Sequence, residues 1–170
     1  MKSKTNLLVE FLKAYDFNEV CEIKLDNEMP TFDYYEDPKS AKLRQATEKG
    51  VYLWVLKENK KPFEVIYVGL INNSTLEGRN KLHERGFKGK DNGGSNSGGN
   101  LKQGILKRIK EGGEIVIYFR KSNLINVMGE ENISLCHIEE AALIKKFNND
   151  SHNLMNAEAV RRRKKQSKKK

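Results

Sequence analysis

Two tyrosines stand in mirrored positions within two neighbouring apolar runs. The stretch from residue 50 to residue 69 reads GVYLWVLKENKKPFEVIYVG, so Tyr52 comes early in the first run and Tyr67 late in the second. In an antiparallel hairpin, a residue early in one strand lies beside a residue late in the next. The two hydroxyls are therefore expected to project toward one surface, and Gly50 and Gly69 allow a close neighbour there. The alternative is that both tyrosines are ordinary core aromatics.

Three further groups with useful chemistry follow on the next predicted elements. Arg79 and His83 are four residues apart, so they share one face of a predicted helix. Lys81 and Arg85 lie on the same helix and compete with Arg79 as the cation of a site. Glu140 lies on a later predicted helix and supplies a carboxylate. A guanidinium, an imidazole and a carboxylate thus accompany the two phenols.

The periodicity of apolar residues predicts the elements that position these groups. Helices are predicted at roughly residues 4–16, 74–86, 101–109 and 138–147, and strands at 51–56, 63–68 and 114–120. Residues 20–45 contain Pro30, Pro38 and the run TFDYYEDP, and they are expected to be rich in loops. The predicted fold class is α+β, with a small antiparallel three-stranded sheet flanked by helices in the order β-β-α-α-β-α. An N-terminal extension of helix and loop precedes it.

Composition favours one domain with extensions. The chain has 170 residues, of which 37% are hydrophobic, enough for one sizeable core. We expect an N-terminal extension over residues 1–47, a domain over 48–156 and a basic tail over 157–170. Cys21 and Cys136 are too few for a disulfide framework, and no apolar segment approaches membrane-spanning length. The expected location is cytoplasmic and reducing, without contact to a membrane.

The positive charge is concentrated at the end of the sequence. Residues 161–170, RRRKKQSKKK, contribute +8 of the formal net charge of +9, so the body is nearly neutral. Such a tail is expected to be disordered and can contact phosphates without reading sequence, with Arg161, Arg162 and Arg163 as its arginines. Lys88 and Lys90 border the glycine-rich segment 89–100, which is expected to be a mobile loop. That loop either closes over DNA or is a mere linker.

The combination of these motifs resembles the GIY-YIG endonuclease family. GVY and YVG lie in paired predicted strands, Arg79 and His83 lie on the next helix, and E-x-x-L-I-K runs from Glu140 to Lys145. The resemblance covers roughly residues 48–156. It implies a metal-dependent endonuclease that hydrolyses phosphodiester bonds in double-stranded DNA. It also implies Mg²⁺ as the cofactor, with Mn²⁺ as a plausible substitute.

The resemblance also assigns roles to the two tyrosines and to residues of the predicted helix 74–86. Tyr52 would activate the attacking water, and Tyr67 would orient water or phosphate. The ordinary pKa of a tyrosine, about 10, is high for a base, so the site is expected to lower it through Arg79 and the metal. Arg79 would bind the scissile phosphate with paired hydrogen bonds. His83 would accept or relay a proton.

The remaining family positions lie near the end of the domain. Glu140 would bind the metal, because Mg²⁺ accepts a single carboxylate together with waters and a phosphate oxygen. Glu139 points about 100° away on a helix, so only one of the two faces the site. The family pattern also contains an asparagine after this helix. Asn153 is our choice for it, and Asn156 competes.

Several biological roles remain open for such a chain. Within the nuclease class, a type II restriction enzyme is favoured, and a homing, phage-type or repair nuclease is a close rival. A noncatalytic nucleic-acid-binding module on the same scaffold is the alternative outside that class. One active site cuts one strand, so double-strand cleavage needs a homodimer or two sequential visits.

Overall fold

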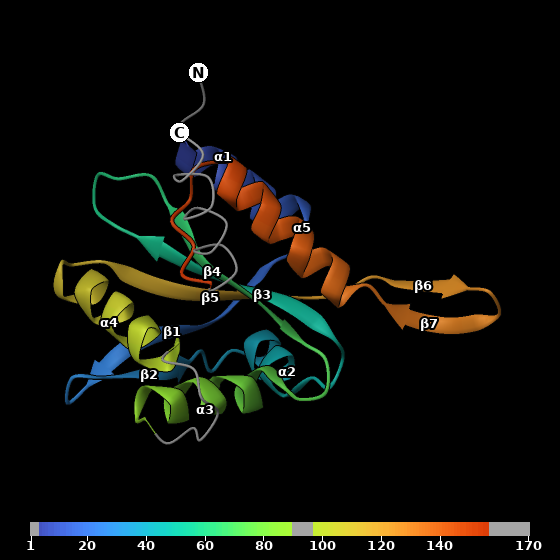
Figure 1. The fold of residues 1–170 in the computed structure, drawn as a ribbon, viewed down its shortest axis with the longest axis horizontal. Helices are drawn as coiled ribbons and strands as arrows, with labels where there is room; N and C mark the ends of the chain where they lie inside the picture. Colours follow the sequence, from blue (N-terminus) through green and yellow to red (C-terminus); the bar gives the residue numbers. More distant parts are fainter. Residues whose placement is uncertain (1–3, 90–96, 157–170) are drawn as a thin grey trace.

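The computed structural model describes residues 4–89 and 97–156, which form five helices and seven strands (Figure 1). Their bounds are α1 Lys4–Ala14, β1 Asn18–Asp26, β2 Met29–Tyr34, α2 Pro38–Gln45, β3 Gly50–Lys57, β4 Glu64–Ile71, α3 Leu76–Phe87, α4 Ser97–Lys110, β5 Glu114–Lys121, β6 Leu124–Val127, β7 Glu130–Ser134 and α5 Cys136–Asn149.

Five strands form one antiparallel sheet in the order β2-β1-β5-β3-β4, and β6 and β7 form a separate two-stranded sheet. The predicted strands β3, β4 and β5 are confirmed. The predicted three-stranded sheet is wrong, because residues 18–34 add two strands to it where a loop-rich segment was expected. Residues 124–134 add the separate hairpin, which the sequence did not predict.

The β1–β2 hairpin lacks the usual turn signal. Asn27 and Glu28 both have positive φ angles, 48° and 60°, as in a type I′ turn, where glycine normally marks the sequence. Pro30 is tolerated because β2 is an edge strand of the sheet. Pro38 occupies the first turn of α2, behind the N-cap Asp37, where a missing N–H costs nothing. Both prolines, which usually interrupt helices and strands, therefore lie at positions where a strand or a helix tolerates them.

The helix α4 begins earlier than expected. It starts at Ser97, inside the segment 89–100 that was predicted to be a loop, and it ends at Lys110 before Gly112, which has a φ of 86°. The rest of the predicted loop, residues 90–96, lies outside the described residues.

Helices cover both faces of the five-stranded sheet (Figure 1). Val51, Leu53 and Val55 of β3 pack in one core cluster with residues of α1 and α5. The alternate residues Tyr52, Trp54 and Leu56 pack in a second cluster with residues of α3 and α4. Because β3 is buried on both faces, its side chains reach either layer, and Tyr52 lies in the α3 layer.

The residues after α5 cover the outer edge of β4. His152 Nδ1 accepts a hydrogen bond from the main-chain N–H of Val65 at 3.0 Å, and the N–H of Met155 donates to the carbonyl of Ile66 at 2.6 Å. These bonds occupy main-chain groups that an open edge strand leaves exposed to other chains. Across the described residues, none of the helices has the length and apolar character that spanning a membrane requires.

Candidate active site

The two tyrosines lie on the same face of the β3–β4 hairpin. Their rings are stacked, with centroids 6.0 Å apart and planes 25° apart. Tyr52 pairs directly with Gly69, while Tyr67 pairs with Trp54, so the tyrosines are diagonal neighbours. A Cβ atom at Gly69 would overlap the ring and hydroxyl of Tyr52. Glycine at this position therefore provides the space in which the Tyr52 phenol sits.

The helix α3 brings Arg79 and His83 to the Tyr52 hydroxyl. Arg79 Nε donates a hydrogen bond to that oxygen over 3.4 Å, and His83 Nε2 lies 2.9 Å from it. A guanidinium cannot accept a hydrogen bond, so the Tyr52 hydroxyl does not donate to Arg79. The hydroxyl also hydrogen-bonds the side chain of Tyr67, and the tautomer of His83 decides whether Nε2 accepts from the hydroxyl or donates to it. The four side chains form one hydrogen-bonded group.

An adjacent side of α3, about 100° round the helix from Arg79 and His83, is held by β2. Asn80 Nδ2 donates to the Tyr34 hydroxyl at 2.9 Å, and Glu84 Oε1 accepts from the main-chain N–H of Phe32 at 3.2 Å. Asn80 is only 1% exposed. The helix that carries Arg79 and His83 is thus positioned by strand residues that the sequence assigned to a loop-rich extension. Asn80 lies four residues after the buried Leu76, and a polar residue at such a core position is the signal that was missed.

Burial dominates the ionisation of the site. It raises the pKa of Tyr52 well above its ordinary value, Tyr67 raises it further, and Arg79 opposes both effects. Burial also raises the pKa of Tyr67, where the positive charge of Arg79 opposes and the negative charge of Glu140 adds to the effect. Burial and Arg79 together lower the pKa of His83 to about 3. For the protein alone, both phenols are therefore protonated at neutral pH and the imidazole is neutral. Arg79 by itself does not outweigh burial, and the expected lowering of the Tyr52 pKa by Arg79 and the metal together stays a prediction.

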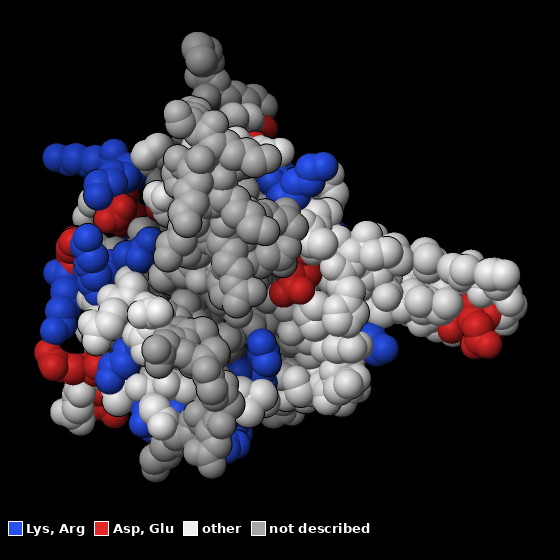
Figure 2. All heavy atoms as spheres, viewed as in Figure 1, with Lys and Arg blue, Asp and Glu red and all other residues white. Residues whose placement is uncertain are grey.

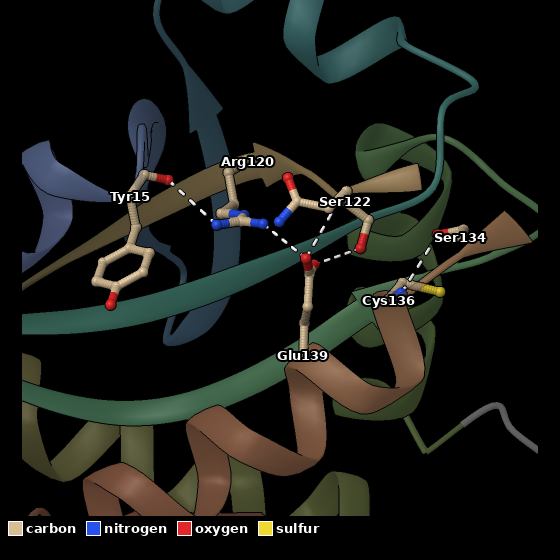
Figure 3. A network of polar contacts seen from close by, with 7 residues as sticks. Tyr15, Arg120, Ser122, Ser134, Cys136 and Glu139 are labelled. Atoms are coloured by element: carbon tan, nitrogen blue, oxygen red, sulfur yellow. Dashed lines mark hydrogen bonds and ion pairs between the residues drawn. The ribbon is translucent and has the colours of Figure 1, made fainter. Parts of the chain in front are cut away.

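The adjacent carboxylates of α5 have different surroundings. Glu139 pairs with Arg120 at 2.7 Å and accepts hydrogen bonds from the Ser122 hydroxyl and from the main-chain N–H of Asn123 (Figure 3). Glu140 lies close enough to the other group of side chains for its charge to raise the pKa of Tyr67. Glu139 is thus engaged by Arg120, and the assignment of Glu140 to the site of the tyrosines stays a prediction.

The donor set limits which metals fit this site. Within residues 4–89 and 97–156, no group of three or more His, Cys, Asp or Glu side chains is placed to hold a metal ion. The candidate ligand is the half-buried carboxylate of Glu140. One carboxylate fits Mg²⁺, which keeps several waters and uses substrate phosphate oxygens, whereas structural zinc requires four protein ligands.

The two candidate asparagines lie after α5 in different environments. Asn156 is buried, and its side chain accepts from the N–H of Val68 at 2.9 Å and donates to the carbonyl of Val68 at 2.5 Å. Asn153 is exposed, and its main-chain N–H donates to Glu64 at 2.6 Å. Asn156 therefore holds the outer edge of β4, directly beside the tyrosine-bearing part of that strand.

The other predicted cations lie apart from the tyrosines or outside the described residues. Lys81 pairs with Glu77 at 2.8 Å, while Arg85 and Lys88 are exposed. Of the cations on α3, Arg79 is therefore the one placed at the Tyr52 hydroxyl. The predicted DNA contacts Lys90, Arg161, Arg162 and Arg163 fall outside the described residues.

Comparison with known proteins identifies a related fold. No protein-family model matches the chain, and no curated protein matches it. A mutant of bacteriophage T4 EndoII is similar in structure, with a TM-score of 0.55 and 19% sequence identity over 82% of this chain and 94% of that chain. The restriction endonuclease HPY188I in complex with product DNA gives a TM-score of 0.45 and 17% identity over 83% of this chain and 78% of that chain. The similarity to EndoII shows that this chain shares the fold of that protein.

Proposed function

We propose that this chain is a Mg²⁺-dependent endonuclease of the GIY-YIG type that hydrolyses phosphodiester bonds in double-stranded DNA. The observation that carries the proposal is the hydrogen-bonded chain from Arg79 through Tyr52 to His83, beside Tyr67 and within reach of the charge of Glu140. The fold shared with EndoII supports it.

Arg79 suits the binding of a scissile phosphate. Its guanidinium is half-buried, so its charge is less screened than on an open surface. Its N–H donors contact the hydroxyls of Tyr52 and Tyr67, and the fork geometry of a guanidinium matches phosphate oxygens. The same cation therefore binds substrate and acts on the phenol, which couples phosphate binding to the state of Tyr52.

Tyr52 is the proposed water activator, because its hydroxyl lies between a cation that donates to it and an imidazole that can accept from it when His83 carries its hydrogen on Nδ1. The proton of Tyr52 is proposed to pass to the free Nε2 of the neutral ring, and burial and Arg79 oppose the imidazolium that results, as the lowered pKa of His83 indicates. Burial opposes formation of the phenolate. A positive charge is consequently required beside the hydroxyl, and Arg79 supplies one.

Glu140 is the proposed ligand of Mg²⁺. Mn²⁺ prefers the same oxygen donors and is expected to substitute. The bound metal would stabilise negative charge on the phosphate oxygens. The chain's own contribution is a carboxylate on α5, kept separate from Glu139, which is already occupied by Arg120.

Digestion of supercoiled plasmid tests the proposal directly. Wild-type protein is expected to nick or linearise it with Mg²⁺ or Mn²⁺ and to stop in excess chelator. Glu140→Gln is expected to abolish cleavage and to preserve most DNA binding, while Glu111→Gln at an exposed position is a matched control.

Two outcomes would contradict the proposal. Undiminished cleavage in excess chelator would show that the reaction does not require a metal. DNA binding without cleavage in the presence of any metal would indicate a noncatalytic binding module. Sequencing of the product ends then separates a restriction enzyme, which cuts at one short sequence, from a homing, phage-type or repair nuclease.

A further inference from the structure

Residues 124–134, which we call the arm, form a hairpin that projects beyond the body of the protein (Figure 1). Met128 at its tip is completely exposed. The large apolar side chains that the arm exposes are Leu124, Ile125, Val127, Met128 and Ile133. Ile125 and Ile133 are direct cross-strand partners, so they share one face.

An arm of this composition requires a partner. An isolated two-stranded hairpin is marginally stable in water, and clustered exposed apolar residues mark interaction sites. Ile138, near the start of α5 and so close to the arm in sequence, is a further exposed apolar residue. Exposed apolar side chains thus occur along the arm and again at the start of α5.

The charge of the arm argues against a nucleic-acid partner. Residues 124–134 contain Glu130 and Glu131 and no Lys or Arg, although the chain has a net charge of +9. Acidic side chains are visible at the tip of the projection (Figure 2). Phosphate groups would be repelled there, whereas a surface with both apolar and basic residues would be complementary.

The base of the arm presents such a basic surface. A hollow of about 470 Å³ where α1, α2 and β5 meet includes Lys39, Lys121 and Asn123 in its lining, with Asp16 as its one carboxylate. A second hollow of about 320 Å³ includes Lys42 and Lys121, with Glu48 as its one carboxylate. Lys121 pairs with Glu48. Lys39 and Lys42 are exposed and form no ion pair with any residue in the described part of the chain.

We propose that two copies of this chain associate through their arms, side by side and antiparallel, with each acidic tip lying against the basic hollows of the other copy. Two arms of equal length that overlap fully in this orientation place each tip at the base of the other. The contact is then the same on both copies, as a twofold interface requires. The apolar faces provide the buried area, and the charges fix the antiparallel orientation.

A charge-swap experiment tests this arrangement by mass, without DNA or activity. The first variant carries Glu130→Lys and Glu131→Lys, and the second carries Lys39→Glu and Lys42→Glu. Each alone brings like charges together at both tips, so the dimer dissociation constant measured by sedimentation is expected to rise at least about tenfold. In an equimolar mixture each tip meets an opposite charge again, and a heterodimer of near wild-type affinity is expected.

A second pair of variants tests the apolar contact. Val127→Ser combined with Ile133→Ser should weaken the dimer while the circular dichroism spectrum of the folded protein is kept, whereas Leu7→Ser, at an exposed position on α1, should leave the dimer unchanged. A wild-type protein that stays monomeric at tens of micromolar would overturn the proposal. So would a mixture that fails to restore association, or arm variants that change DNA affinity and not mass.

Discussion

The Tyr52 hydroxyl lies 2.9 Å from Nε2 of His83 and is buried together with its ring. This contact offers the phenol proton an acceptor inside the protein when His83 carries its hydrogen on Nδ1. The ring of Tyr67 stacks on that of Tyr52 but is half-buried, so it faces solvent more directly. Two residues of the same type thus have distinct surroundings, which makes their contributions separable.

Replacing each tyrosine with phenylalanine separates proton transfer from packing. Tyr52→Phe keeps the ring and removes the oxygen, so single-turnover cleavage of a labelled duplex should fall by at least about 100-fold while the fold persists. Tyr67→Phe should cost less if that residue orients water. Thermal melting provides the control for folding. A near-native rate for Tyr52→Phe would refute its role, and a larger defect in Tyr67→Phe would transfer that role to β4.

His83 should make folding stability depend on pH. Its pKa is about 3 in the folded protein and about 6.5 in the unfolded chain, so the unfolded chain binds the extra proton between these values. This contribution is complete above pH 6.5 and is lost as the pH falls toward 3, at up to about 1.4 kcal/mol per pH unit. Urea denaturation of wild type and His83→Gln from pH 7 to pH 4 measures it.

The difference between those two stability curves isolates the histidine from the carboxylates that titrate in the same range. His137→Gln, at an exposed histidine, serves as the matched control. Curves for wild type and His83→Gln that run parallel over the whole range would show that His83 becomes protonated without a penalty, contrary to its buried position.

The neighbouring carboxylates of α5 should separate stability from activity. Glu139→Gln leaves the guanidinium of Arg120 without its counter-charge in a nearly buried position, so the free energy of unfolding should fall by about 3 kcal/mol. Glu140→Gln should change it little and abolish cleavage. Chemical denaturation and single-turnover cleavage of both variants are the measurements. Equal losses of stability would place Glu140 in a structural role.

The contact between α3 and β2 should affect catalysis at a distance from the reacting atoms. Asn80→Ala leaves the Tyr34 hydroxyl without its partner, so the free energy of unfolding should fall by about 1–3 kcal/mol. Because the helix also carries Arg79 and His83, turnover at saturating DNA should fall while DNA affinity is retained. Leu82→Ala, on the exposed side of the same helix, is the control. A loss of stability with unchanged turnover would show that Asn80 stabilises the fold and does not position the catalytic side chains.

The sequence predicts the central elements well because their apolar patterns are strong. The strands β3, β4 and β5 and most of the helices follow from continuous or helical apolar spacing, and the nearness of Tyr52 and Tyr67 follows from hairpin geometry. The β1–β2 hairpin does not, because its turn uses Asn27 and Glu28 without glycine. The burial that raises the Tyr52 pKa arises from elements distant in sequence, so no local pattern contains it.

The middle position of β5 in the sheet has a consequence for how the chain folds. Asn18 pairs with Phe119, roughly a hundred residues later in the sequence, and β5 is the strand that joins the β1–β2 hairpin to the β3–β4 hairpin. Contacts of such long range slow folding, because a large loop must close before they form. The helix α3 contacts both hairpins. We therefore expect Arg79 and His83 to reach their final positions only after residues 114–121 have entered the sheet, late on the folding pathway.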